Sequence, residues 1–234
     1  MKFNHTRLFF CMLVTIVLTI FVGVYFLNDR QFFVVSLLVL FQVFVPFVYA
    51  FEGRKPPARE LVMIAVLVAI GVAGRAAFFM LPQFKPVVAM VVISGVALGG
   101  ETGFLVGVMT ILVSNIFFGQ GPWTPWQMFA MGLIGLLAGV CFHRRKKNVS
   151  RWVLAIFGGL ATVIIYGGIM NPASVIMFQP QPTREMFLFA WVYGLPFDLI
   201  HGIATAFFIL IMAQPILAKI NRIQTKYGAF RRNS

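Results

Sequence analysis

The sequence contains few charged residues, and acidic ones are the scarcest. Of 234 residues, 60% are hydrophobic and 11% are charged, with six Asp and Glu against 19 Lys and Arg. A soluble domain averages about 25% charged residues, so the composition excludes an ordinary soluble fold and predicts an integral membrane protein. The net charge of +13 does not indicate nucleic-acid binding, because the basic residues lie between apolar runs, where membrane topology places them.

Cysteine and the common catalytic motifs are also lacking. Cys11 and Cys141 both lie inside apolar runs, near ends that we predict to be cytosolic, which argues against a structural disulfide. There is no phosphate-binding G-x-x-x-x-G-K-[ST] loop, no H-E-x-x-H zinc motif and no G-x-S-x-G nucleophile motif. The chain is therefore not expected to hydrolyse ATP by that route.

Apolar runs make up most of the sequence. Those long enough to cross a bilayer are residues 8–27, 31–51, 61–80, 103–119, 126–142, 152–171 and 187–213. A shorter run at 86–100 ends at Gly99-Gly100-Glu101, which predicts a tight hairpin before the next span. We therefore predict an all-α integral membrane protein with about eight transmembrane helices, the first of them an uncleaved span rather than a signal peptide.

The basic residues predict how the chain crosses the membrane. With the N-terminus inside, fifteen of the 19 Lys and Arg lie in cytosolic segments, in agreement with the positive-inside rule. Both termini are then cytosolic in a multi-pass protein of the cell membrane. The loop at 52–60 divides an accessory hairpin, residues 1–51, from a working unit, residues 60–213, which is followed by a basic cytosolic tail, residues 214–234.

An uncharged stretch rich in proline and glycine interrupts the working unit on the predicted outer side. It spans residues 119–127, with the sequence GQGPWTPWQ. Its two prolines and two glycines disfavour a regular helix and favour fixed turns. Trp123 and Trp126 suit two roles, since tryptophans anchor interfacial loops in membranes and could also form a stacking floor for a flat ligand.

Polar groups inside the apolar spans are further candidates. Arg75 costs about 2.5–3.5 kcal/mol on insertion scales, so it should snorkel to the surface, face a wet cavity or have a partner. Asp198, the only acid deep in an apolar run, could pair with Arg75, recognise a ligand or relay protons. His201 shares a helical face with Asp198, but no cluster of ligands predicts a metal site. Asn115 is a candidate hydrogen-bond donor to a ligand.

Two more features have both a structural and a functional interpretation. Ala65, Ala69 and Ala73 are spaced by four and form a small-residue stripe on one helical face. Such a stripe would pack either within this bundle or against a helix of another protein. The last outer loop, residues 171–184, contains three prolines and two glutamines and would be either a passive connection or a lid.

The unit at 60–213 resembles the substrate-binding S components of energy-coupling factor (ECF) vitamin transporters. The likeness rests on the alanine stripe, the run GRAAFFMLPQFKP at 74–86, the short second and third helices and the run SNIFFGQGPWTPWQ at 114–127. The last run is similar to the branch that includes the cobalamin-type S component. The resemblance implies a six-helix bundle, here preceded by a two-helix hairpin that departs from the family pattern.

The resemblance also implies a function and partners. The chain would be the vitamin-binding subunit of an importer, with no catalytic residues and no cofactor of its own. Ala65, Ala69 and Ala73 would contact a membrane coupling subunit, which is attached to two ATPase subunits that use ATP. Family ligands bind beneath the outer loops after the first, third and fifth helices, which here are 81–86, 119–127 and 171–187.

We therefore predict a vitamin pocket, most specifically for cobalamin or a related corrinoid. The predicted ligand-binding residues are Arg75, Lys85, Asn115, Gln120, Trp123, Trp126, Gln127 and Asp198. Riboflavin, dimethylbenzimidazole or another flat heterocycle would suit the same aromatic loop. A rival hypothesis is an intramembrane enzyme that acts on a lipid or isoprenoid through Asp198 and His201.

Overall fold

The structure, a computed structural model, describes residues 58–146 and 149–227, together with six scattered residues among the first 57 (14, 15, 18, 19, 38 and 42). The accessory hairpin predicted at 1–51 therefore lies almost wholly outside the described residues, and the total of eight spans stays a prediction. Within the described part every regular element is a helix and none is a strand. The all-α prediction is confirmed to that extent.

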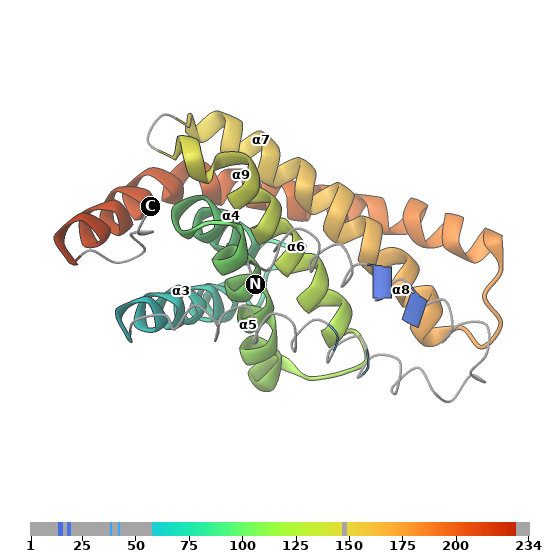
Figure 1. The fold of residues 1–234 in the computed structure, drawn as a ribbon. Coiled ribbons are helices and arrows are strands. Elements are labelled where there is room, and N and C mark those ends of the chain that lie inside the picture. Colours follow the sequence, from blue (N-terminus) through green and yellow to red (C-terminus); the bar gives the residue numbers. More distant parts are fainter. Residues whose placement is uncertain are drawn as a thin grey trace.

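The helices follow one another with short connections (Figure 1). They are α3 (Ala58–Ala77), α4 (Val87–Leu98), α5 (Gly100–Phe118), α6 (Thr124–Phe142), the 3-10 turn η1 (His143–Arg145), α7 (Arg151–Ala161), the π-helical turn η2 (Thr162–Gly167), α8 (Gly168–Phe178) and α9 (Arg184–Tyr227). Five helical stretches are long and apolar enough to cross a membrane, with α7, η2 and α8 counted as one, and α4 is a shorter apolar helix. The protein is a multi-pass membrane protein.

Helix α4 lies at the centre of the bundle. All of its 12 residues are buried, and it packs against α3, α5, α6 and α9. A helix that is apolar on every side belongs in an interior, and α4 is only about 18 Å long, too short for a bilayer core of about 30 Å. The predicted hairpin at Gly99 is confirmed, because Gly99 separates α4 from α5 with a φ of +101°.

Glycines bring α4, α5 and α6 into backbone contact. A Cβ atom on Gly103 of α5 would clash with the carbonyl oxygen of Gly135 in α6 and with the Cα of Gly95 in α4. A Cβ on Gly139 would clash with the backbone of Gly100. Small residues permit this close approach, and close packing is a main source of helix association in membranes.

Helix α8 corrects the prediction for the last outer loop. The loop was predicted to begin at residue 171, but α8 continues through Pro172 to Phe178, so only residues 179–183 connect α8 to α9. In hydrocarbon no water is present to bond with the backbone, so the chain satisfies its own N–H and C=O groups by staying helical. The remaining connection is too short to form the lid that we considered.

Helix α9 is longer than the predicted span. It passes through Pro215 and ends at Tyr227. Near its end, Gln224 accepts a hydrogen bond from Lys146 Nζ at 2.9 Å, and Lys146 also donates to the carbonyl oxygen of Ala97 at 3.3 Å. This contact provides a donor for a carbonyl at the end of α4 that has no partner within the helix.

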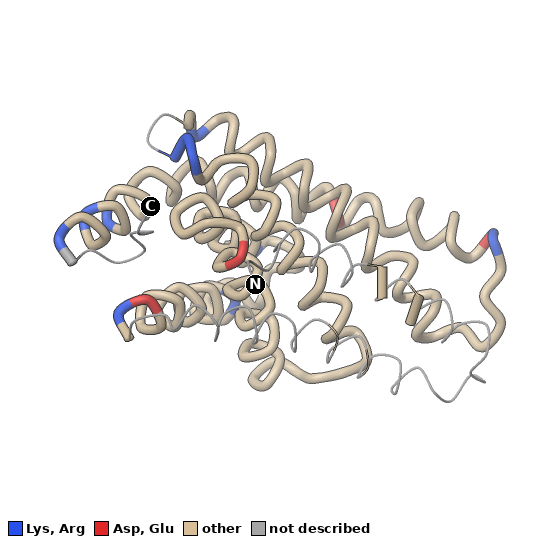
Figure 2. The backbone as a smooth tube through the Cα atoms, in the orientation of Figure 1, with Lys and Arg blue, Asp and Glu red and all other residues tan. Residues whose placement is uncertain are grey.

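Basic residues gather at the same end of the bundle. Figure 2 shows Lys and Arg at the start of α3, at the connection from α6 to α7 and along the end of α9. The opposite end, where α9 begins, carries Arg184 beside Glu185. The asymmetry agrees with the positive-inside pattern, and the cytosolic location of the basic end stays a prediction.

Candidate functional site

The turn after α3 is held between α5 and α9. Phe78 and Phe84 contact Phe208 of α9, with ring centroids 5.0 and 5.3 Å apart. Phe79 stacks on Phe118 of α5 at 5.1 Å. These aromatic contacts fix the first of the three predicted outer loops against the helices on both sides of it.

Arg75, near the end of α3, reaches across to α5. Its Nη1 atom donates hydrogen bonds to Asn115 Oδ1 at 2.6 Å and to Ser114 Oγ at 2.7 Å. The guanidinium carbon lies 5.2 Å from the centroid of the Phe118 ring. Arg75 is half-buried, and its charge is held by neutral hydrogen-bond acceptors and an aromatic ring.

Asn115 joins helices that are far apart in the sequence. It is fully buried, and its Nδ2 atom donates to Thr124 Oγ1 and to Gln127 Oε1, both at 2.9 Å. Gln127 Nε2 donates in turn to the Tyr166 hydroxyl at 3.3 Å. Arg75, Asn115, Gln127 and Tyr166 therefore form one hydrogen-bonded chain from α3 through α5 and α6 to η2, which we call the outer network.

Asp198 and His201 of α9 lie near the Tyr166 end of the outer network. The His201 ring meets the Tyr166 ring edge-on, with centroids 5.0 Å apart. Asp198 Oδ2 accepts a hydrogen bond from Asn171 Nδ2 at 2.7 Å. Gly167, the last residue of η2, packs directly against the Asp198 carboxylate.

The pairing of Arg75 with Asp198 that the sequence suggested is not formed. Arg75 finds its hydrogen-bond partners on α5, and Asp198 finds its partner on α8. The reason is helix adjacency, because α3 packs beside α5 whereas α9 packs beside α8. Asp198 is therefore a neighbour of the outer network and not its counter-ion.

The loop at 119–127 places its predicted residues in different surroundings. Trp126 is 6% exposed and belongs to α6, and its Nε1 atom has no hydrogen-bond partner among the described residues. Trp123 is half-buried, and its ring lies against Gly121. Gln120 is exposed and donates to the carbonyl oxygen of Leu112 at 3.2 Å. Contact between these side chains and a ligand stays a prediction.

Lys85 lies in the turn that joins α3 to α4. Its Nζ atom donates to the carbonyl oxygen of Leu81 at 2.9 Å, and the side chain is partly buried. Burial and the positive charge of Arg75 both lower the pKa of the Lys85 ammonium. Two cationic side chains thus lie at the C-terminal end of α3.

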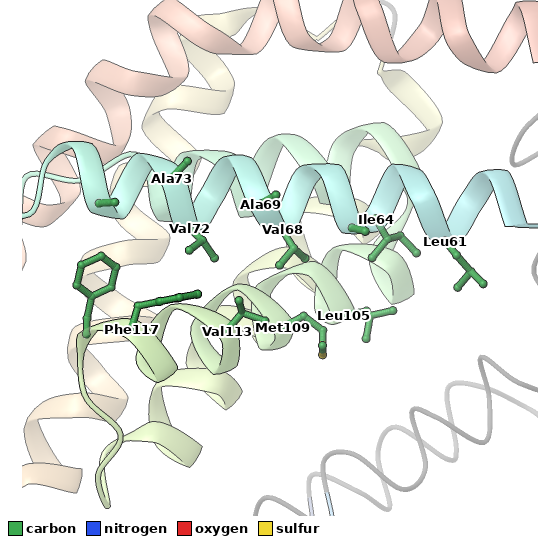
Figure 3. Close-up of a pocket in the computed structure, with 13 residues that line it drawn as sticks. Leu61, Ile64, Val68, Ala69, Val72, Ala73, Leu105, Met109, Val113 and Phe117 are labelled. Carbon is green, nitrogen blue, oxygen red and sulfur yellow. The ribbon is translucent and has the colours of Figure 1, made fainter.

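The alanine stripe lies on an open apolar face. Ala65, Ala69 and Ala73 are exposed and line a groove of about 780 Å³ between α3 and α5 (Figure 3). The α5 wall of the groove includes Met109 and Val113. Within the described part the stripe is therefore not used for tight internal packing, and its contact with a coupling subunit stays a prediction.

Some polar residues of this region were missed from the sequence. Ser114 and Thr124 lie inside the run at 114–127 but are not among the predicted ligand-binding residues, and neither are Tyr166 and Asn171. A hydroxyl or amide inside an apolar span was the available signal. In residues 58–146 and 149–227 no three His, Cys, Asp or Glu side chains lie together as a metal site.

Comparison with known proteins identifies the family. A protein-family model described as "ECF transporter, substrate-specific component" matches residues 59–213. The chain is 32% identical over 138 residues to a UPF0397 protein of Aliivibrio salmonicida (strain LFI1238), covering 53% of this chain and 74% of that protein. It is also 32% identical over 96 residues to a UPF0397 protein of Vibrio atlanticus (strain LGP32), covering 39% of this chain and 52% of that protein. No solved structure matches.

The family match extends from the start of α3 into α9 and so includes the outer network and the alanine groove. The UPF0397 relatives add similarity over half to three quarters of their own length, and their names specify no ligand. The chain belongs to the family of ECF transporter substrate-specific components.

Proposed function

We propose that this chain binds a vitamin near the predicted outer ends of its helices, and that the vitamin is a corrinoid such as cobalamin. Its family consists of transporter components rather than enzymes, and membership implies association with ECF membrane coupling and ATPase subunits. The observation that carries the proposed ligand site is the outer network of Arg75, Asn115, Gln127 and Tyr166.

The outer network supports this proposal because it fixes several polar groups within apolar surroundings. Ligand sites are mostly apolar, with a few placed polar groups that orient the ligand. The Asn115 amide is bonded at both its oxygen and its nitrogen, and so is that of Gln127, so neither side chain is free to turn. A ligand at the outer ends of α3, α5 and α6 would meet a preformed polar surface.

The choice of a corrinoid rests on the likeness of the run at 114–127 to the cobalamin-type branch. That run supplies Ser114, Asn115, Thr124 and Gln127 to the hydrogen bonds around the outer network, and it also contains both tryptophans. Riboflavin and dimethylbenzimidazole remain the alternatives, because a flat heterocycle would use the same aromatic surface.

Ligand retention tests this proposal. The full-length protein would be co-expressed with ECF coupling subunits, purified in detergent, incubated with cobalamin, riboflavin and dimethylbenzimidazole, desalted and analysed by mass spectrometry. We expect a retained corrinoid. Retention of another vitamin would contradict the corrinoid as ligand but support vitamin binding. A protein that retains none of the vitamins would contradict the whole proposal.

Substitution of Trp123 tests whether this side chain contacts the proposed vitamin. We expect Trp123→Ala to weaken vitamin binding by about tenfold or more, because an aromatic contact and its buried area would be lost. Isothermal titration with the retained vitamin measures the change. Trp152→Ala is the control, since Trp152 is 59% exposed at the start of α7. Unchanged affinity in the Trp123→Ala, Trp126→Ala double variant would remove the tryptophans from the site.

A further inference from the structure

Two cations lie at the C-terminal end of α3, and the described residues provide no carboxylate to balance them. In the described part the acids are Glu60, Glu101, Glu185 and Asp198. Glu60 and Glu101 lie in the first turns of α3 and α5, at the far end of each helix from the outer network. Glu185 is exposed at the start of α9, and Asp198 is bonded to Asn171. None of these four forms an ion pair with Arg75 or Lys85.

Some of the hydrogen-bond donors of Arg75 have no partner among the described residues. A guanidinium carries five N–H groups in a planar fork that matches a carboxylate or phosphate. Among the described residues Arg75 makes two hydrogen bonds, both from Nη1, to Ser114 and Asn115. The Nε and Nη2 groups have no acceptor among the described residues, so one edge of the fork is available.

Lys85 adds a second charge at the same place. Among the described residues its one hydrogen bond is to the carbonyl oxygen of Leu81. Its neighbour Phe84 packs on Phe207 and Phe208 of α9, with ring centroids 5.7 and 5.3 Å apart. The aromatic contacts hold the turn that carries Lys85, and the charge of Lys85 interacts unfavourably with that of Arg75. A bound anion would relieve that repulsion.

The indole of Trp126, in the first turn of α6, is another buried donor. Its Nε1 atom has no partner in the described part, and native structures leave few such donors. Trp126 is two residues from Thr124 on α6, so the two side chains point to nearly opposite sides of the helix. Arg75 and Lys85 are therefore the groups that favour a ligand rich in acceptors.

We propose that the transported ligand carries an oxyanion, a carboxylate or a phosphate, which docks on the open edge of the Arg75 guanidinium with Lys85 beside it. This inference rests on the proposed function and specifies the chemical class of its ligand. The phosphodiester of a nucleotide-bearing corrinoid satisfies it, and so does the carboxylate of an acidic vitamin. Neutral riboflavin and dimethylbenzimidazole do not.

Pairs of vitamins that differ in the anionic group test this inference. For carboxylate the probes are nicotinate against nicotinamide and pantothenate against panthenol. For phosphate they are flavin mononucleotide against riboflavin and cobinamide phosphate against cobinamide. The full-length protein with its coupling subunits in nanodiscs would be titrated with each probe. We expect one pair to bind, with the anionic member about tenfold tighter or more, and the pair that binds identifies the oxyanion.

Charge-removing variants complete the test. Arg75→Gln should abolish the preference for the anionic member, Lys85→Gln should reduce it several-fold, and Arg75→Lys should retain part of it, because the charge remains and the fork is lost. Arg222→Gln is the matched control, since Arg222 is exposed near the C-terminal end of α9, at the opposite end of the bundle from Arg75. Thermal unfolding of each variant establishes that it is folded.

Two outcomes would overturn the inference, and they are distinguishable. The first outcome is that a vitamin binds equally well with and without its anionic group, or that the preference for the anionic member survives in both Arg75→Gln and Lys85→Gln. The inferred oxyanion site is then wrong, whereas the vitamin-binding function stands. If the wild-type complex binds none of the probes and retains no vitamin, the proposed function fails and the inference fails with it.

Discussion

Asn115 is the side chain on which the outer network depends. It accepts from Arg75 and donates to Thr124 and Gln127 while it is 0% exposed. Removing a partner from a buried polar group costs about 1–3 kcal/mol. An apolar residue of similar size at position 115 would leave Gln127 Oε1 and part of the Arg75 fork without partners.

We therefore expect Asn115→Leu to lower the free energy of unfolding by about 1–3 kcal/mol. A change of this size corresponds to a melting temperature lower by about 2–4 °C per kcal/mol, which a thermal unfolding assay in detergent measures. Ile116→Ala is the control, because Ile116 is the next residue of α5 and is 66% exposed. A variant with the same melting temperature as the wild type would mean that the network contributes nothing to stability.

The sequence predicts the polar residues of the site better than it predicts their partners. Arg75, Asn115 and Gln127 were selected because a polar group in or beside an apolar run is conspicuous, and they do share one hydrogen-bonded chain. The pairing of Arg75 with Asp198 was wrong because sequence gives the depth of a residue along its helix but not which helices are neighbours. Asn171, one helix away from Asp198, was the partner.

At the scale of the helices, α5 and α6 cross closely because the residues at the crossing are glycines, which have no Cβ atom. Gly135 packs against the Gly103 backbone so closely that a Cβ atom would clash with the carbonyl oxygen. A backbone has no alternative rotamer, so a methyl group there must separate the two helices. Loss of this close contact weakens packing along the whole crossing.

We expect Gly135→Ala to lower the melting temperature, while Gly168→Ala leaves it unchanged or raises it. Both are the same substitution within a helix, where alanine is intrinsically favoured over glycine by about 1 kcal/mol. A Cβ on Gly168 meets no atom within 4 Å, so only the Gly135 variant suffers a clash. Equal melting temperatures of the two variants would contradict the close crossing.

Sequence also predicts some helix boundaries better than others. The hairpin between α4 and α5 was predicted because Gly99 and Gly100 interrupt an apolar run, and the positive φ of Gly99 explains why glycine is there. The end of α8 was misplaced because Asn171 and Pro172 are typical of turns in soluble proteins. In hydrocarbon the need to satisfy backbone groups outweighs that preference.

At the scale of the whole molecule, α3 carries both surfaces that transport would require. Its C-terminal end carries Arg75 of the outer network, and its exposed face carries Ala69 and the rest of the alanine groove. The groove is apolar, whereas the network is polar and extends toward η2. Because the two surfaces use different residues of one helix, ligand binding and coupling should be separable by substitution.

We expect Ala69→Phe to abolish vitamin uptake in cells while the purified protein still retains the vitamin. A phenylalanine at this position would fill the groove between α3 and α5, where a helix of the coupling subunit is proposed to approach, without entering the outer network. Uptake of labelled vitamin and retention by mass spectrometry measure the two effects separately. Val66→Phe is the matched control, because Val66 is also exposed on α3 but does not line the groove. Normal uptake in Ala69→Phe would show that the groove is not the coupling surface, and lost uptake in both variants would show that bulk anywhere on the exposed face of α3 is enough to block it.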